Sequence, residues 1–227
     1  MASNLEKFQE NINDNWVNAP ETIEFKYRCY SMIYYQFYDD IKHLENSNKI
    51  IMPNKILNDI SIYNDVLYPL HFTINDSEVM FTPSEFKEDI KDIYIPQHFI
   101  DNLGLDDIDK EYKITLVNKE IKKGTRLKIK PHSSDFLEIQ DYKQYLEKNL
   151  LELYTTLTKN QTLLIPYFDK TLMIDILECD PNDIISIIDT DIEVDIETPW
   201  DYVKPKEHSL ESPRFLKDIS NEHKKFK

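Results

Sequence analysis

The histidines, the side chains that most often bind metals or transfer protons, are scattered along this sequence. They are His43, His71, His98, His132, His208 and His223. No two of them have the close helical or strand spacing of a preformed metal pair. His71 lies in an apolar run and His98 at a helix start, so we interpret both as packed or capping residues rather than general bases. The sequence therefore predicts no metal site and no cofactor.

The two cysteines, Cys29 and Cys179, lie far apart in apolar segments. This placement indicates buried reduced thiols rather than a disulfide or a zinc site. Arg28 precedes Cys29 and could lower its pKa, but adjacent strand positions face opposite sides of a sheet. We therefore expect a structural thiol rather than a nucleophile.

Glycine occurs only twice, at Gly104 and Gly124, and this scarcity excludes several classes of enzyme. Phosphate loops, dinucleotide-binding fingerprints and nucleophile elbows each need several glycines close together. The sequence Asp189-Thr190-Asp191 could be mistaken for an aspartic protease loop, but Asp191 stands where that loop needs glycine. We therefore expect a protein that is not an enzyme.

One segment, residues 189–197, concentrates carboxylates at a regular spacing. Acidic residues alternate there with mostly apolar ones, which on a strand would place the acids on one face and the aliphatic side chains on the other. Such an acidic face is either simply solvated or a docking surface for a basic partner. We expect the aliphatic side to pack on a helix and the acidic side to face solvent. The candidate binding residues are Asp191, Glu193, Asp195 and Glu197.

The overall charge limits the partners of this chain. Its 227 residues include 27 basic and 42 acidic side chains, and the net charge of −15 repels phosphate backbones and anionic lipid headgroups. Uncharged stretches such as 29–38 are shorter than the ~20 apolar residues of a membrane span. Residues 1–14 lack the apolar core of a secretory signal. We expect no nucleic acid binding, no membrane insertion and a cytoplasmic location.

Two regions with different patterns must position these residues. Short β-rich runs dominate the first region, at 23–33, 49–52, 67–74, 78–82, 93–95 and 112–117. Pro53 and Pro96 head short helices in that region, and Gly104 follows the second helix.

The second region begins after a polar, lysine-rich stretch near 118–123. It contains one long predicted helix over 142–158, started by a capping box at Asp141 and Gln144. Predicted strands follow at 162–167, 171–178, 184–188 and 189–197. Residues 1–22 and 200–227 are polar, and we expect flexible termini there.

Many short motifs in this order resemble the N-terminal domain of the ubiquitin fusion degradation protein 1 family, over roughly residues 23–199. They include Tyr27-Arg28-Cys29-Tyr30, Lys49-Ile50-Ile51-Met52-Pro53, Tyr68-Pro69-Leu70-His71-Phe72, Tyr94-Ile95-Pro96-Gln97-His98-Phe99, Ser134-Asp135-Phe136-Leu137 and Ser186-Ile187-Ile188. The resemblance implies a mainly β, α+β fold: a double-psi β-barrel subdomain over 23–117, then a smaller α/β roll over 118–199. Asn160 stands where the family tends to have a turn glycine, and Asn tolerates positive φ.

The resemblance also implies a function. Family members bind ubiquitin and ubiquitin chains and recruit substrates for degradation, including ER-associated degradation, by an AAA ATPase of the valosin-containing protein type. No glycine follows Gly124, so this sequence lacks the Phe-x-Gly-x-Gly type box that docks on the ATPase. We expect that contact to be indirect or made through a separate partner protein, in the cytoplasm and also in the nucleus. The alternative is an adaptor-binding module resembling the N-terminal domain of the ATPases themselves.

Overall fold

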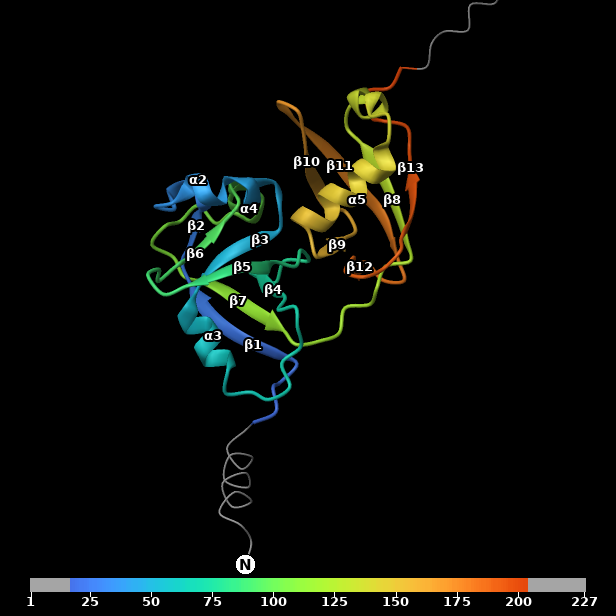
Figure 1. Ribbon diagram of the computed structural model, residues 1–227. Coiled ribbons are helices and arrows are strands. Elements are labelled where there is room, and N and C mark those ends of the chain that lie inside the picture. Colours follow the sequence, from blue (N-terminus) through green and yellow to red (C-terminus); the bar gives the residue numbers. More distant parts are fainter. Residues whose placement is uncertain (1–16, 204–227) are drawn as a thin grey trace, which may run out of the picture.

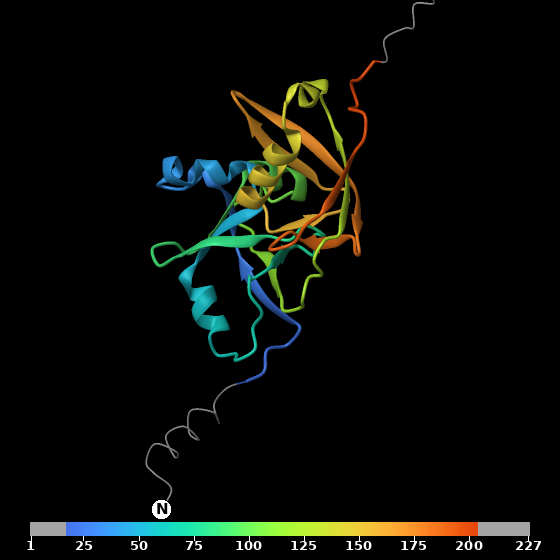
Figure 2. The same cartoon turned by 45° about the vertical axis from the view of Figure 1, so that its right-hand side comes forward.

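The computed structural model describes residues 17–203, and most of the two predicted flexible segments, 1–22 and 200–227, lies outside these residues. The described chain has an α+β fold built mostly from strands, with four α-helices. Its two larger hydrophobic clusters draw on separate stretches of sequence, one between residues 29 and 116 and the other between 127 and 187. In Figures 1 and 2 these stretches form two neighbouring units, blue to green and yellow to red.

The first unit contains a three-stranded sheet and a four-stranded sheet. The antiparallel sheet has the order β1-β7-β4, formed by Thr22–Tyr27, Tyr112–Val117 and Phe72–Ile74. The mixed sheet has the order β2-β6-β3-β5, formed by Cys29–Ser31, Ile93–Ile95, Lys49–Pro53 and Thr82–Lys87. A bridge between Phe72 and Phe81 links the two sheets. The strands in the described residues form no closed barrel, so the double-psi arrangement remains a proposal.

Proline and glycine mark the helices of this unit as predicted. α3 (Asn54–Ile60) follows Pro53, and α4 (Gln97–Leu103) follows Pro96 and ends at Gly104, whose φ is 62°. The elements that the sequence did not predict are η1 (Met32–Tyr34), α2 (Tyr38–Ile41) and η2 (Lys42–Asn46).

Three of the predicted strands in this unit were wrong in extent. The run 23–33 breaks into β1 and β2, and its last residues enter a 3₁₀ helix. The run 67–74 keeps only β4, because Pro69 has no N–H to donate and the Leu67 N–H instead donates to the Asn118 side chain. The run 78–82 shares only Thr82 with β5, which continues through Pro83 because β5 is an edge strand.

The second unit places one helix on a four-stranded sheet. The sheet has the order β10-β11-β8-β13, formed by Thr162–Tyr167, Lys170–Asp180, Arg126–Pro131 and Glu193–Ile196. α5 (Tyr142–Leu153) packs on it, η3 (Ser134–Glu138) precedes the helix, and β12 (Ile184–Ser186) pairs with β9 (Thr156–Thr158). Asn160 has φ 65°, which confirms the turn conformation that the sequence implied.

The predicted long helix and the predicted acidic strand are both shorter than expected. α5 ends at Leu153 because Tyr154 is extended and buried, and the chain then passes through Thr155 into β9. β13 begins at Glu193 rather than residue 189, because Asp189 takes a turn conformation with φ 48°.

Polar contacts join the two units. The Tyr154 hydroxyl donates to the Asn46 carbonyl at 2.7 Å, and the Thr82 and Thr155 hydroxyls lie 2.6 Å apart. The Asn48 amide donates to the Thr156 hydroxyl at 3.4 Å. Buried polar groups need such partners, so these contacts set how the units meet.

Candidate functional site

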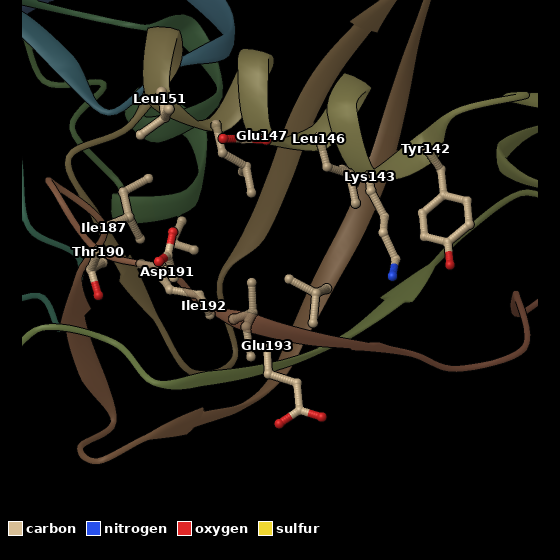
Figure 3. Close-up of a pocket in the computed structure, with 14 residues that line it drawn as sticks. Tyr142, Lys143, Leu146, Glu147, Leu151, Ile187, Thr190, Asp191, Ile192 and Glu193 are labelled. Atoms are coloured by element: carbon tan, nitrogen blue, oxygen red, sulfur yellow. The ribbon is translucent and has the colours of Figure 1, made fainter.

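An apolar groove of about 450 Å³ lies between α5 and the segment 190–194, where the predicted acidic residues are found (Figure 3). Its apolar lining includes Leu127, Leu146, Leu150, Leu157, Ile187, Ile192 and Val194. Leu151 extends this lining outward and is 53% exposed. The accessible apolar surface of the groove therefore comes mainly from Leu151 and from the half-buried Ile192 and Val194, because the deeper lining residues belong to the buried core.

The helical wall of the groove follows from the sequence of α5. The Asp141 side chain caps the helix by accepting from the Gln144 N–H at 3.2 Å. Residues at helical spacing, Leu146, Leu150 and Leu153, are buried in the core. Charged residues on the adjacent helix face, Lys143 and Glu147, therefore fall on the rim of the groove.

The strand wall follows from the parallel pairing of β13 with β8. Glu193 N–H donates to the Thr125 carbonyl at 3.0 Å, and Glu197 N–H donates to the Ile129 carbonyl at 2.8 Å. With this register, Ile192 and Val194 pack against the core, and Glu193 points away from α5 (Figure 3).

Two of the four predicted binding residues form ion pairs with β8, contrary to the expectation that they would simply face solvent. Arg126 Nε donates to Asp195 Oδ2 at 3.0 Å, and Lys128 Nζ lies 2.8 Å from Glu197 Oε1. The hydrogen bond from Lys128 lowers the pKa of Glu197 below its usual value. The reason is the parallel register, which sets the acids of β13 beside the bases of β8.

The other two predicted residues, Asp191 and Glu193, are exposed and form no ion pair with any residue between 17 and 203. Asp191 and Glu193 line the groove together with Lys143 and Glu147, which are likewise unpaired within the described residues. The carboxylates of Asp191 and Glu147 and the ammonium group of Lys143 therefore border the apolar surface, and the Glu193 carboxylate lies next to it on the side that faces away from α5 (Figure 3). Together these four side chains carry a net negative charge.

The helix residues of the site and the whole of β8 were not predicted from the sequence. The signal for β8 was available, because Arg126, Lys128 and Lys130 alternate with Leu127 and Ile129 over a strand-length window. No local sequence pattern indicates that Lys143 and Leu151 line the groove, because their place in it depends on where α5 lies against the segment 190–194.

The two thiols, the buried His71 and the half-buried His98 lie in environments that disfavour their charged forms. Burial raises the pKa of Cys29 to about 12 and that of Cys179 to about 11. Burial also lowers the pKa of His71 and of His98 to about 4. Within residues 17–203, no three metal-binding side chains gather in a possible metal site, and no helix is long and apolar enough to cross a membrane.

Comparison with known families matches almost all of the described chain. The model "Ubiquitin fusion degradation protein UFD1, N-terminal subdomain 1" matches residues 23–122, and the model of N-terminal subdomain 2 of the same protein matches residues 123–199.

Individual relatives are similar over the same region. Ubiquitin fusion degradation protein 1 of Saccharomyces cerevisiae is 31% identical over 209 residues, which are 88% of this chain and 56% of the yeast protein. Its Dictyostelium discoideum homolog is 32% identical, with 86% of this chain and 58% of the homolog covered. The human ubiquitin recognition factor in ER-associated degradation protein 1 is 31% identical, with 80% and 59% covered. The chain thus spans a little over half the length of these relatives.

Proposed function

Because this chain belongs to the ubiquitin fusion degradation protein 1 family, we propose that it is a non-enzymatic module that binds ubiquitin and ubiquitin chains. Its role would be to recruit ubiquitin-bearing substrates for degradation, including ER-associated degradation. The names of its relatives support this role: they are called ubiquitin fusion degradation proteins and, in mammals, ubiquitin recognition factors. The family matches also favour this function over that of an adaptor-binding ATPase domain.

The observation that carries the proposal is the groove, whose acidic rim forms no ion pair with any residue between 17 and 203. Ubiquitin's recognition patch is apolar with basic residues around it, so the lining and the charge of the groove are both complementary to it. Burial of apolar surface supplies the favourable free energy, at roughly 25 cal/mol per Å². Asp191 and Glu193 would act mainly on the association rate, as exposed rim charges do. Asp195 and Glu197 would contribute less, because their carboxylates are engaged by β8.

The proposal includes a division of the chain at 117/118. A double-psi β-barrel subdomain would occupy 23–117 and an α/β roll 118–199, each around its own hydrophobic cluster. Polar contacts across the junction, such as that of Tyr154 with Asn46, would hold the two as one unit. A fixed arrangement of the two subdomains favours the binding of ubiquitin chains, because the contact with a second ubiquitin of the same chain becomes intramolecular.

We further propose that the module acts with an AAA ATPase of the valosin-containing protein type, in the cytoplasm and also in the nucleus. In this proposal the contact with the ATPase is indirect or made through a separate partner protein.

An NMR titration of the labelled 227-residue chain with mono-ubiquitin and with a defined chain tests the binding proposal. We expect chemical-shift changes at groove residues, above all at Asp191, Glu193 and Lys143. We also expect the ubiquitin chain to bind more tightly, per ubiquitin, than mono-ubiquitin. Charge reversal of Asp191 and Glu193 to Lys should weaken binding. The matched control Asp169→Lys, in the β10–β11 turn, should not. The absence of any shift at about 1 mM ubiquitin would refute the proposal.

A further inference from the structure

β13 is the last strand of its sheet, and its outer edge pairs with no other strand between residues 17 and 203. The N–H groups of Glu193 and Glu197 point inward, toward the Thr125 and Ile129 carbonyls of the β8 side. In a parallel ladder, successive residues direct their backbone groups to opposite sides. The N–H and C=O groups of Val194 and Ile196 therefore point outward, where a further strand would bind.

Helix α5 forms one wall of the groove beside this edge and the segment 190–194 forms the other (Figure 3). A strand added alongside β13 would continue the sheet, so one of its faces would turn toward the helix. Alternate side chains on that face would enter the apolar groove near Tyr142 and Leu146 (Figure 3). The groove is thus placed to receive every second side chain of an extended segment.

The opposite face of such a strand would meet carboxylates. Glu193 points away from α5 (Figure 3) and forms no ion pair within the described residues. Asp195, two residues further along the strand, lies on the same face, where Arg126 already binds its carboxylate. Basic side chains at alternate positions of the added strand would lie diagonal to these acids, within reach of a long side chain. The edge therefore favours aliphatic residues toward the helix and basic residues on the other side.

We propose that the outer edge of β13 binds a partner segment in extended conformation, in which basic residues alternate with aliphatic ones. The inference rests on the proposed function in placing a polypeptide partner on this surface, and it adds the form in which that partner binds. Backbone hydrogen bonds to Val194 and Ile196 supply affinity, and the groove and the acids supply specificity.

Charge argues against one other occupant of the edge, and sequence pattern argues against a second. A second copy of the chain would bring its own acidic β13, and like charges directly opposite each other destabilise a sheet. Residues 204–227 contain no run of four in which basic and aliphatic residues alternate, so the chain's own C-terminal segment is a poor match. A basic segment of another protein remains the complementary partner.

Amide hydrogen exchange of the full chain, measured by NMR with the synthetic peptide acetyl-Lys-Val-Arg-Ile-Lys-Val-amide, tests the inference. We expect saturating peptide to slow exchange at Val194 and Ile196 by about tenfold or more, because their N–H groups gain acceptors. Exchange at Asp195 should change little, since the register already directs its N–H toward β8. The same peptide with alternate backbone nitrogens methylated keeps its charge and side chains, and it should not bind.

A matched pair of variants separates this edge from general charge attraction. Glu193→Lys should lower the affinity for the peptide by about tenfold. Asp169→Lys, which makes the same charge change in the β10–β11 turn, should leave this affinity unchanged. Equal binding of the methylated peptide, or unchanged exchange at Val194 and Ile196 in the saturated complex, overturns the inference.

The alternative occupants give distinct results. Protection of Val194 and Ile196 that rises with protein concentration alone would identify a second copy, and protection lost on removing residues 204–227 would identify the chain's own segment. Either result overturns the inference. Ubiquitin binding without peptide binding would also refute it and leave the proposed function standing. Peptide binding without ubiquitin binding would refute only the proposed function.

Discussion

The hydroxyl of Tyr154 donates to the backbone carbonyl of Asn46 at 2.7 Å and accepts from the N–H of Leu164 at 3.0 Å. One buried side chain thus links the first unit, at the end of η2, to β10 in the second. Burial raises the pKa of this phenol, so it stays protonated and able to donate at any ordinary pH.

Removal of this hydroxyl should destabilise the protein. Tyr154→Phe leaves the Asn46 carbonyl and the Leu164 N–H without their partner in a buried place, which costs about 1–3 kcal/mol. Urea unfolding monitored by fluorescence measures the loss. The control Tyr68→Phe changes a ring that is 70% exposed and should shift stability by less than about 0.5 kcal/mol. Equal stability of the two variants would show that the contact does not stabilise the junction.

The acids of β13 should separate into two classes in ubiquitin binding. Glu193→Lys should slow ubiquitin association at low salt by several-fold, because an unpaired rim charge is reversed. Glu197→Lys should chiefly lower thermal stability, because it sets a third positive charge beside Lys128 and Lys130. Stopped-flow association at two salt concentrations and thermal melts distinguish the effects. The same change in association rate for both variants would contradict this separation of the acidic residues into two classes.

The two glycines should respond differently to alanine. A Cβ at Gly124 would lie 2.6 Å from Ile185 Cδ1 and 2.9 Å from Ile192 Cδ1. Gly124→Ala therefore overpacks the end of the groove and should lower the free energy of unfolding by ~1–3 kcal/mol. Gly104→Ala meets no atom within 4 Å but must adopt φ +62°, which costs ~1 kcal/mol. NMR shifts at Ile192 should accompany only the first substitution. Unperturbed Ile192 signals in Gly124→Ala would show that the site has room.

Stability should decline as the pH falls below neutrality, because His71 is buried and His98 is half-buried. Burial lowers the pKa of each imidazole from 6.5 to about 4, so the unfolded chain binds protons that the folded chain excludes. The stabilisation is complete above pH 6.5 and is lost as the pH falls toward 4. Between about pH 6 and about pH 5, the free energy of unfolding of His71→Gln should fall by ~1 kcal/mol less than that of the unsubstituted protein. Urea unfolding at the two pH values tests this. The exposed control His43→Gln should show the full decline in the free energy of unfolding. An equal decline in His71→Gln would refute the contribution of His71.

Several elements of this protein could be predicted from local sequence. The prolines at 53 and 96 and Gly104 placed α3 and α4, because the fixed φ of proline and the left-handed conformation of glycine act within a few residues. β6, β7 and β10 coincide with the predicted runs 93–95, 112–117 and 162–167. The alternation around residue 193 likewise predicted the acidic and aliphatic sides of β13.

Contacts between distant segments decided the rest, and the sequence around each residue does not encode them. Tyr154 continues the helical spacing of α5, but its burial against Asn46 draws it into an extended conformation instead. The acidic residues of the segment 193–197 are indistinguishable in sequence. The parallel register with β8 pairs Asp195 and Glu197 and leaves Glu193 unpaired in the described chain. The groove exists only because α5 lies against the segment 190–194, and such long-range packing is set by burial and hydrogen bonding across the whole fold.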